Sequence, residues 1–236
     1  MTQPEGLVAD NLSRAYGYVY ALKEVSLTVR AGEAVGVFGP NGAGKSTLLR
    51  IAAGLLRPSS GTVRVFGGDL WETLGLRGKV GFLSHAIGLY PNLTVRENLS
   101  FFAELAGVGA ASRRADDVIV RLELDRYAST EVRHLSRGWQ QRAAIARGLL
   151  ADPRLLLWDE PFSGLDEKTC EMVSRLLAEF KSEGRTALVA SHEFDRTMTV
   201  CERAVVIDRG RLAFDGHGAE ASDAYRRIIG VAKSAA

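Results

Sequence analysis

The chain has 236 residues, of which 46% are hydrophobic and 25% are charged, as in an ordinary globular protein. This composition excludes a wholly disordered chain, a collagen-like fibre and a small disulfide-stapled domain. The 30 Lys and Arg residues nearly balance the 28 Asp and Glu residues, so the net charge of +2 gives no electrostatic reason to expect nucleic acid as a partner. The only cysteines, Cys170 and Cys201, lie far apart in the sequence, and we expect free thiols.

Neither a membrane span nor a targeting segment is predicted. No apolar run reaches the roughly 18 residues that a membrane helix needs. The first residues lack the basic and apolar regions of a secretory signal. We therefore expect a cytoplasmic protein that reaches a membrane only through a partner.

The first third of the chain contains five predicted strands and one helix. Short apolar runs bounded by turn residues predict strands at 7–12, 25–29, 34–38, 62–66 and 79–83. A helical pattern directly after the third strand predicts a helix over 45–53, which Gly54 ends.

From about residue 94 to residue 151 the periodicity becomes helical. Thr94 and Glu97 form a capping box, in which Thr94 is the N-cap of a helix that continues to about residue 106. The same periodicity predicts helices over 112–124 and 136–150, the last of them stopped by a proline.

Strands and helices alternate again in the last third. Strands are predicted at 155–158, 186–190, 203–207 and 212–214, and a helix at 167–182. This alternation favours an α/β fold with a mostly parallel sheet. We interpret the chain as one domain, 1–236, with a core formed by 1–87 and 153–236 and a helical subdomain inserted at about 88–152.

A glycine-rich loop lies between the predicted strand at 34–38 and the predicted helix at 45–53. It matches the phosphate-loop pattern GxxxxGK(S/T). Glycines let backbone amides face phosphate oxygens, and the helix N-terminus adds partial positive charge. We expect Lys45 to reach the β- and γ-phosphates and Ser46 to coordinate Mg²⁺. The candidate nucleotide-binding residues here are Gly39, Pro40, Asn41, Gly42, Ala43, Gly44, Lys45, Ser46 and Thr47.

Two carboxylates follow the apolar strand predicted at 155–158. In enzymes with a phosphate loop, an Asp at the end of such a strand holds Mg²⁺, and we predict this role for Asp159, through a water molecule. The adjacent Glu160 is placed to orient or deprotonate the attacking water. A strand that merely ends in a polar turn is the alternative, but the presence of the phosphate loop favours the catalytic interpretation.

Further motifs follow in an order that is typical of one family. The sequence LSRGW at 135–139 is similar to the LSGGQ signature, and SGLD at 163–166 resembles the D-loop. His192 follows the strand at 186–190, as the switch histidine does, and Tyr16 lies where an aromatic residue stacks on adenine. Along almost its whole length the chain resembles the nucleotide-binding subunit of ABC transporters.

This resemblance implies an ATPase that powers a separate transmembrane permease from the cytoplasmic face of the membrane, with ATP and Mg²⁺ bound. It implies a P-loop NTPase core with an antiparallel β edge and an inserted α-helical subdomain. Two cassettes would pair head to tail, with each ATP between one phosphate loop and the other signature. The resemblance assigns contacts with the nucleotide to Ser136, Gly138, Asp166, His192 and Tyr16, with Tyr18 and Tyr20 as competitors of Tyr16.

Three residues depart from the family pattern. Arg137 replaces the first signature glycine, and its side chain either contacts phosphate or points to solvent. Trp139 replaces the usual Gln and packs against either a partner or the helical lobe. His85 replaces a Gln that touches Mg²⁺ and whose loop meets the membrane subunit. Because Mg²⁺ prefers oxygen ligands, we expect His85 to contact the metal only through water or not at all.

Residues 82–102 resemble the ATPase of the haem-exporter-type complex of cytochrome c maturation. That subfamily tends to carry His at the position of His85, followed by a Gly-Leu pair, here Gly88 and Leu89. The resemblance implies a role in haem export. The alternatives are the ATPase of a drug- or polysaccharide-type exporter, an ATP-binding scaffold with little turnover, and a non-transport ABC protein acting on nucleic acid or ribosomes.

Overall fold

The structure is a computed structural model that describes residues 4–73, 75–84 and 86–234, with side chains through residue 230. The strands are β1 (Glu5–Tyr16), β2 (Val19–Arg30), β3 (Ala34–Phe38), β4 (Ser60–Val65), β5 (Gly68–Asp69), β6 (Val80–Leu83), β7 (Leu155–Asp159), β8 (Thr186–Ala190), β9 (Arg203–Asp208) and β10 (Arg211–His217). The α-helices are α1 (Lys45–Ala52), α2 (Val95–Leu105), α3 (Ala111–Arg121), α4 (Arg137–Leu149), α5 (Glu167–Ser182), α6 (Phe194–Met198) and α7 (Gly218–Ser234). Short 3₁₀ helices are η1 (Leu76–Lys79), η2 (Asp125–Tyr127) and η3 (Val132–His134).

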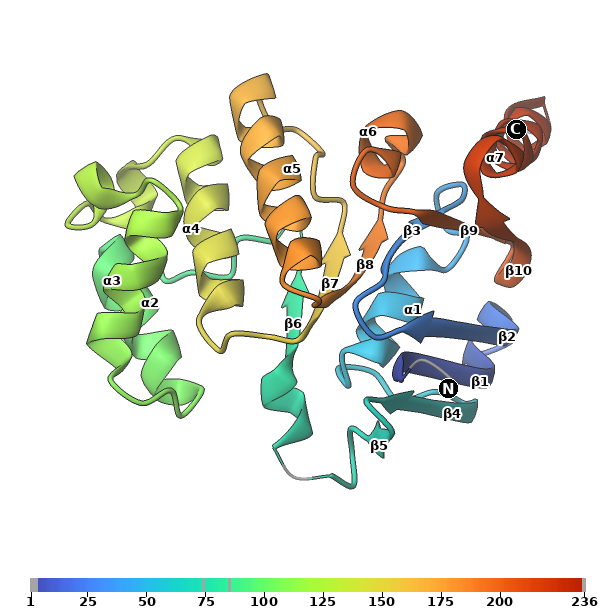
Figure 1. Ribbon diagram of the computed structural model, residues 1–236, viewed down its shortest axis with the longest axis horizontal. Coiled ribbons are helices and arrows are strands. Elements are labelled where there is room, and N and C mark those ends of the chain that lie inside the picture. Colours follow the sequence, from blue (N-terminus) through green and yellow to red (C-terminus); the bar gives the residue numbers. More distant parts are fainter. Residues whose placement is uncertain (1–3, 74, 85, 235–236) are drawn as a thin grey trace.

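A six-stranded sheet in the order β10-β9-β3-β8-β7-β6 forms the centre of the molecule (Figure 1). Five strands run parallel, and β10 pairs antiparallel with β9 at one edge. Along β7, Leu155 and Leu157 pack on the side of α1, whereas Leu156 and Trp158 pack on the side of α5. Because both faces of the sheet are covered at its centre, the inner strands β3, β7 and β8 are continuous apolar runs, and the sequence predicted them for that reason.

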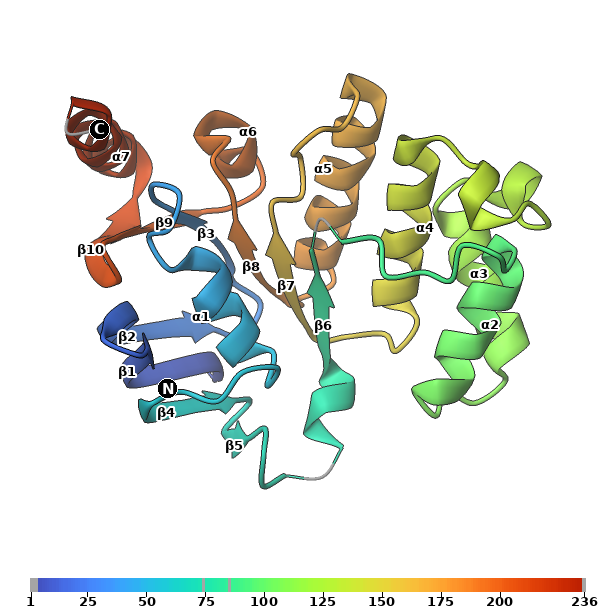
Figure 2. The ribbon, with the colours of Figure 1, turned by 180° about the vertical axis from the view of Figure 1, so that it is seen from behind.

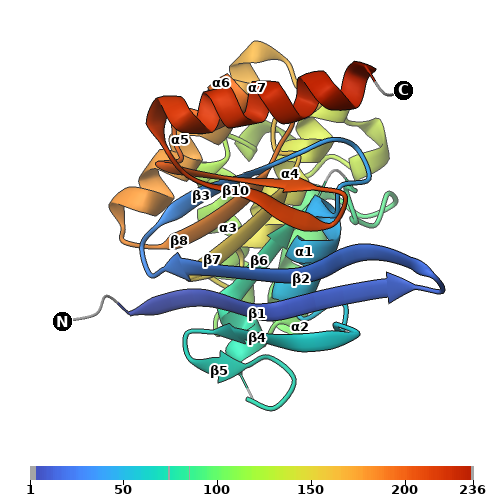
Figure 3. The same ribbon diagram turned by 90° about the vertical axis from the view of Figure 1, so that its right-hand side faces the viewer.

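A second, antiparallel sheet in the order β2-β1-β4-β5 lies beneath the first (Figure 3). This sheet is the expected antiparallel β edge. Its first two strands are longer than predicted and form one hairpin that turns at Gly17, where φ is +60°. The outer end of this hairpin is exposed on both faces, so its aromatic and apolar residues do not alternate with polar ones in the way that marks a half-buried strand in the sequence.

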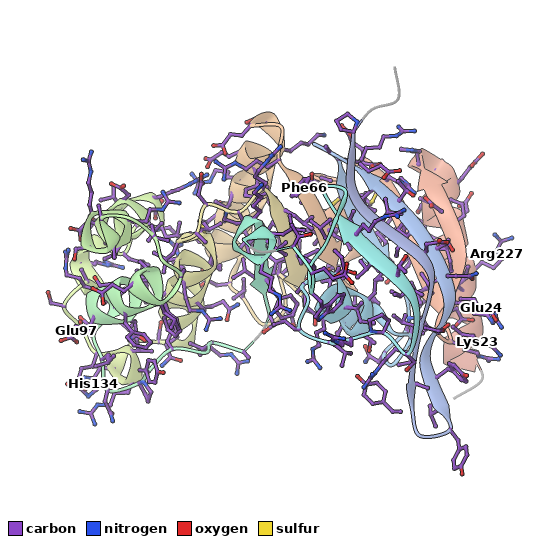
Figure 4. All side chains as sticks on the ribbon, turned by 90° about the horizontal axis from the view of Figure 1, so that it is seen from below. Lys23, Glu24, Phe66, Glu97, His134 and Arg227 are labelled. Atoms are coloured by element: carbon purple, nitrogen blue, oxygen red, sulfur yellow. The ribbon has the colours of Figure 1, made fainter. Side chains whose placement is uncertain are left out.

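Helices α2, α3 and α4 lie together beyond the β6 edge of the sheet, in the stretch that the sequence predicts to be a helical subdomain (Figure 2). The predicted capping box is confirmed: the Glu97 N–H donates to Thr94 Oγ1 at 3.2 Å, and the Thr94 N–H donates to Glu97 Oε2 at 2.8 Å. Helix α3 ends at Arg121, three residues before the predicted end, because Glu123 adopts φ +55°. Figure 4 shows Glu97 and His134 at this end of the molecule and Lys23 and Glu24 at the opposite end.

The C-terminal part contains two helices, α6 and α7, that the sequence did not predict. Helix α7 lies along β9 and β10, where Ala221 packs against Phe38 and Val206 (Figure 3). Within the described part of the chain, every helix is too short or too polar to cross a membrane.

Candidate functional site

The carboxyl ends of three neighbouring strands meet at one edge of the six-stranded sheet. β8 pairs in parallel with both β3 and β7, so all three strands end there. The phosphate loop follows β3, Asp159 ends β7, and His192 comes two residues after β8. The Glu160 N–H donates to the carbonyl oxygen of Ala190 at 2.8 Å and fastens two of these strand ends together. The parallel topology thus gathers side chains that lie far apart in the sequence.

The phosphate loop packs closely against backbone at both of its ends. Gly39 has φ +146°, and a Cβ added there would lie 2.0 Å from the carbonyl oxygen of Ile207. Gly44, directly before α1, has φ +112°, and a Cβ there would lie 2.3 Å from the carbonyl oxygen of Ala21. Because neither position has room for a side chain, both require glycine.

Lys45 is the first residue of α1, and its side chain is buried. Its Nζ donates to the carbonyl oxygens of Gly39 at 2.8 Å and Pro40 at 3.2 Å. Burial lowers the pKa of Lys45, while the nearby carboxylates of Glu160 and Asp159 raise it in part. A buried ammonium group at the N-terminus of a helix suits a phosphate group.

Asp159 is buried, and its Oδ1 has no hydrogen-bond partner among the described residues. An unpaired buried oxygen costs free energy unless a ligand or water satisfies it. Asp159 borders a cavity of about 450 Å³ between the phosphate loop and Glu160. The residues that line this cavity are Ala21, Asn41, Gly42, Ala43, Gly44, Lys45, Ser46, Thr47, Arg50, Asp159 and Glu160.

The polar groups around this cavity fit Mg²⁺ and a nucleoside triphosphate. Mg²⁺ binds oxygen and is usually held by one or two protein groups together with phosphate oxygens and water. Ser46 and Asp159, which both line this cavity, carry side-chain oxygens of this kind. Lys45 supplies positive charge for the phosphates.

Glu160 and His192 form a hydrogen-bonded pair. Glu160 Oε2 lies 2.7 Å from His192 Nδ1, and it also accepts the His192 N–H at 3.3 Å. Glu160 has φ +56°, which is unfavourable for a residue with a side chain and occurs mainly where the surrounding structure enforces it. The backbone therefore directs the Glu160 carboxylate toward the cavity and the histidine.

The three candidate adenine-stacking tyrosines lie in different places on the β1–β2 hairpin. Ala21 lines the phosphate cavity, and Val19 shares its face of the strand. Tyr16 pairs with Val19 across the hairpin and so lies on the cavity face. Tyr20 lines a separate pocket together with Lys23 and Glu24, and Tyr18 is fully exposed at the tip. The geometry favours Tyr16.

The signature segment forms the start of α4. Ser136 occupies the N-cap position of this helix, and its side chain makes no capping hydrogen bond to the described residues. Ser136 and Arg137 are both exposed. Figures 1 and 2 show α4 and α1 on opposite sides of β6 and β7. Ser136 and Gly138 therefore do not reach the phosphate loop of their own chain.

Trp139 packs against the helical lobe of its own chain, which is one of the two alternatives that the sequence left open. Its ring lies 4.5 Å from the ring of Tyr127, centroid to centroid. The guanidinium groups of Arg126 and Arg142 lie 4.8 Å and 4.7 Å from its ring centre. This stack joins η2 to the first turn of α4.

Asp166 is the N-cap of α5, and its Oδ1 accepts the Thr169 N–H at 2.8 Å. This hydrogen bond lowers the pKa of Asp166 below its ordinary value. Its Oδ2 lies 3.7 Å from the position of a Cβ added at Gly138. The D-loop and the signature therefore adjoin each other within one chain.

His85 lies outside the described residues. The segment after it is held by two residues, Asn98 and Arg147, to which no sequence motif assigns a role. Asn98 is fully buried: its Oδ1 accepts the Tyr90 N–H at 2.8 Å, and its Nδ2 donates to nearby carbonyl oxygens. Arg147 donates to the carbonyl oxygen of Gly88 at 2.5 Å. An Asn at a core position of an amphipathic helix was the available signal for this role.

Comparison with known proteins identifies the family. Residues 22–163, more than half of the chain, match the family model described as "ABC transporter". The chain belongs to the ATP-binding subunits of ABC transporters. The cassette is 32% identical over 220 residues to the probable sulfate/thiosulfate import ATP-binding protein CysA of Chlorella vulgaris, covering 92% of this chain and 93% of that protein. It is 34% identical over 209 residues to the linearmycin resistance ATP-binding protein LnrL of Bacillus subtilis (strain 168), covering 87% of this chain and 67% of that protein.

A solved structure extends the comparison to the fold. The dimeric post-hydrolysis state of the ATP-binding cassette MJ0796, bound to ADP and Pi, superposes on this cassette with a TM-score of 0.82 and 31% identity, over 89% of this chain and 98% of that one. The cassette is thus an ATPase with the expected α/β fold. Cassettes of this family bind ATP, dimerise and work with membrane permease subunits. These relatives do not support the haem-exporter subtype expected from residues 82–102.

Proposed function

We propose that this cassette hydrolyses ATP to drive a separate transmembrane permease, as one of two cassettes that close on ATP. The observation that carries this proposal is the cavity at the carboxyl edge of the sheet. There the buried residues Lys45 and Asp159 and the neighbouring Glu160 border one space of about 450 Å³. A cation, a metal ligand and a base together suit phosphoryl transfer to water.

Each of these residues has a distinct role in the proposed reaction. Lys45 and the loop amides hold the β- and γ-phosphates. Ser46 and Asp159 hold Mg²⁺, which neutralises charge on the phosphate oxygens when bound. Glu160 orients the attacking water and accepts its proton, and His192, hydrogen-bonded to Glu160, contacts the γ-phosphate. Tyr16 stacks on the adenine ring.

The second cassette completes the site. Ser136 and Gly138 lie at the exposed start of α4, away from α1 of the same chain (Figure 1). The N-terminus of α4 thus presents backbone N–H groups to an anion held by another chain. We propose that the start of α4 contacts the γ-phosphate bound to a second, identical cassette, with Asp166 nearby. The ATP then links the two cassettes, and hydrolysis releases them.

The partner and location follow from this role. We propose that the cassette lies at the cytoplasmic face of the membrane, held by permease subunits that contact the loop at 85–90. Asn98 and Arg147 hold the described part of that loop in a fixed shape, which suits a docking surface. The haem-exporter cargo rests only on the sequence pattern around His85, Gly88 and Leu89, while a drug-type exporter or an importer agrees better with the relatives.

The first test uses Glu160→Gln. We expect turnover to fall at least 100-fold while ATP binding persists, and the variant to form an ATP-dependent dimer on size-exclusion chromatography with light scattering. Lys45→Ala is the matched control, because it should lose both ATP binding and the dimer. Normal turnover by Glu160→Gln would refute the assignment of the base.

The same Glu160→Gln variant identifies the partner. Purified with a tag from its own cells in a mild detergent, it should retain polytopic membrane subunits that mass spectrometry can identify. Haem-handling subunits among them would support the haem-exporter cargo, and an unrelated permease would refute that cargo. Recovery without any membrane protein would contradict the transport role.

A further inference from the structure

A tyrosine on the C-terminal helix reaches the backbone of His192. The Tyr225 hydroxyl donates to the carbonyl oxygen of His192 at 3.0 Å. Tyr225 belongs to α7, which lies across the β10 edge of the sheet and is separate in sequence from every motif of the site (Figure 3). The contact therefore connects the catalytic edge with the C-terminal helix.

The tyrosine ring is held in place by two phenylalanines. It stacks on Phe194 with 4.8 Å between ring centroids and an angle of 18° between the planes, and it meets Phe38 edge-on at 5.6 Å. Phe38 and Phe194 contact each other at 4.7 Å. Phe38 directly precedes the phosphate loop, and Phe194 comes two residues after His192. This cluster of Phe38, Phe194 and Tyr225 thus connects the segments before the loop and after the histidine.

His192 is consequently held both through its ring and N–H and through its carbonyl oxygen. Its ring and its N–H contact Glu160, and its carbonyl oxygen accepts the hydrogen bond from Tyr225. The side chain of His192 is 55% exposed, so packing alone holds it weakly. Burial raises the pKa of Tyr225, with a smaller contribution from the charge of Glu160, and the phenol therefore remains a donor at neutral pH.

We propose that Tyr225 is a positioning residue of the ATPase reaction, which acts by fixing the His192 backbone so that the imidazole stays against Glu160. This inference rests on the function proposed above for His192. It assigns α7 a role in turnover that goes beyond packing on β9 and β10. If Tyr225 were only a packing residue, its hydroxyl would be dispensable.

Two single substitutions separate the hydroxyl from the packing. Tyr225→Phe keeps the aromatic cluster and removes the hydrogen bond. Ile228→Val is the matched control, because Ile228 lies on the same helix and packs against the same hydrophobic core as Tyr225, and the substitution removes one methylene there. We expect Tyr225→Phe to lower kcat about two- to tenfold with KM for ATP unchanged, the effect that a single hydrogen bond supports. Ile228→Val should leave kcat as it is.

A double-substitution cycle tests the path through His192. His192→Ala should reduce turnover, and adding Tyr225→Phe to it should cause no further loss, since the tyrosine acts through the histidine. Independent, multiplying losses would overturn the proposal. Unchanged turnover in His192→Ala would instead refute the proposed function of the histidine, so the two failures are distinguishable.

Nitrogen-15 NMR of the histidine rings gives a readout that does not depend on turnover. The chain has four histidines, and the signal missing from His192→Ala assigns His192. Tyr225→Phe should shift the Nδ1 resonance of His192 in the nucleotide-free full chain, and Ile228→Val should not. An unchanged resonance in Tyr225→Phe, or an equal shift in both variants, would overturn the inference.

Discussion

Replacing Gly39 with alanine perturbs the phosphate loop at the point where it leaves β3. The added Cβ would lie 2.0 Å from the carbonyl oxygen of Ile207, whereas ordinary contacts begin at 3.4 Å, so the two backbones must separate by about 1.4 Å. The obstacle is backbone on β9 and not a flexible side chain. The loop therefore has to move, and a shift of this size takes its amides away from the positions that face phosphate.

The free energy of unfolding should fall by about 2–5 kcal/mol in Gly39→Ala. Overpacking contributes about 1–3 kcal/mol and the positive φ about 1–2 kcal/mol. For a chain of this length, 1 kcal/mol corresponds to roughly 3 °C in Tm, so we expect a decrease of about 6–15 °C. Gly67→Ala is the control, because φ is +79° there but no described atom lies within 4 Å of the new Cβ. This control should lose only about 3–6 °C.

Differential scanning fluorimetry with and without Mg²⁺–ATP measures both effects. Gly67→Ala should keep the ATP-dependent rise in Tm, because Gly67 lies in the β4–β5 turn, outside the site. Gly39→Ala should lose that rise and about 100-fold or more in kcat/KM, since misplacement by about 1 Å disrupts phosphate positioning. A Gly39→Ala chain as stable as Gly67→Ala, or one that binds ATP normally, would refute the steric argument.

Three further predictions concern other parts of the cassette. Trp139→Ala removes a partly buried ring and its stacking with two arginines. It should lower the free energy of unfolding, measured by urea titration, by about 2–3 kcal/mol. Trp139→Phe keeps an aromatic ring and should lose less than half of that free energy. Burial raises the pKa of Cys201 to about 12 and also raises the pKa of Cys170. Both thiols should therefore react with a disulfide reagent at pH 8 only as fast as the chain unfolds. Rapid reaction of the native protein would contradict this prediction. The hydrogen bond from the Thr169 N–H lowers the pKa of Asp166. The ionised cap therefore stabilises the fold above about pH 4, and this stabilisation is lost as the pH falls further. Asn also caps helices, so Asp166→Asn should show a smaller loss of Tm between pH 5 and pH 3 than the native chain.

Local sequence patterns were sufficient to predict the elements with a strong apolar period. The continuous apolar strands β3, β7 and β8 and the capping box at Thr94 appear within a residue of their predicted positions. The sequence underestimated the β1–β2 hairpin because its outer end is exposed, and it missed α6 because five residues give too short a period. The end of α3 depended on a left-handed residue, Glu123, which no local pattern signals.

The residues of the candidate site also divide into those that the sequence located and those that only the tertiary structure placed. The phosphate loop and the acidic strand end are continuous motifs, and the sequence located both because their chemistry requires fixed residue types at fixed spacing. The choice among three tyrosines depended on which face of the hairpin looks into the cavity. The packing of Trp139 depended on Tyr127, a residue twelve positions away on a different element.

The sequence by itself determined the family, the phosphate-loop motif and the elements with a strong apolar period, because motif spacing and apolar periodicity are properties of neighbouring residues. Only the tertiary structure decided which distant groups meet. Parallel pairing of β3, β8 and β7 brings Glu160 within 2.7 Å of His192, and the docking of α7 brings Tyr225 to the carbonyl oxygen of that histidine. These contacts join residues about 30 positions apart, and the packing of whole elements decides such distances where local sequence preference does not.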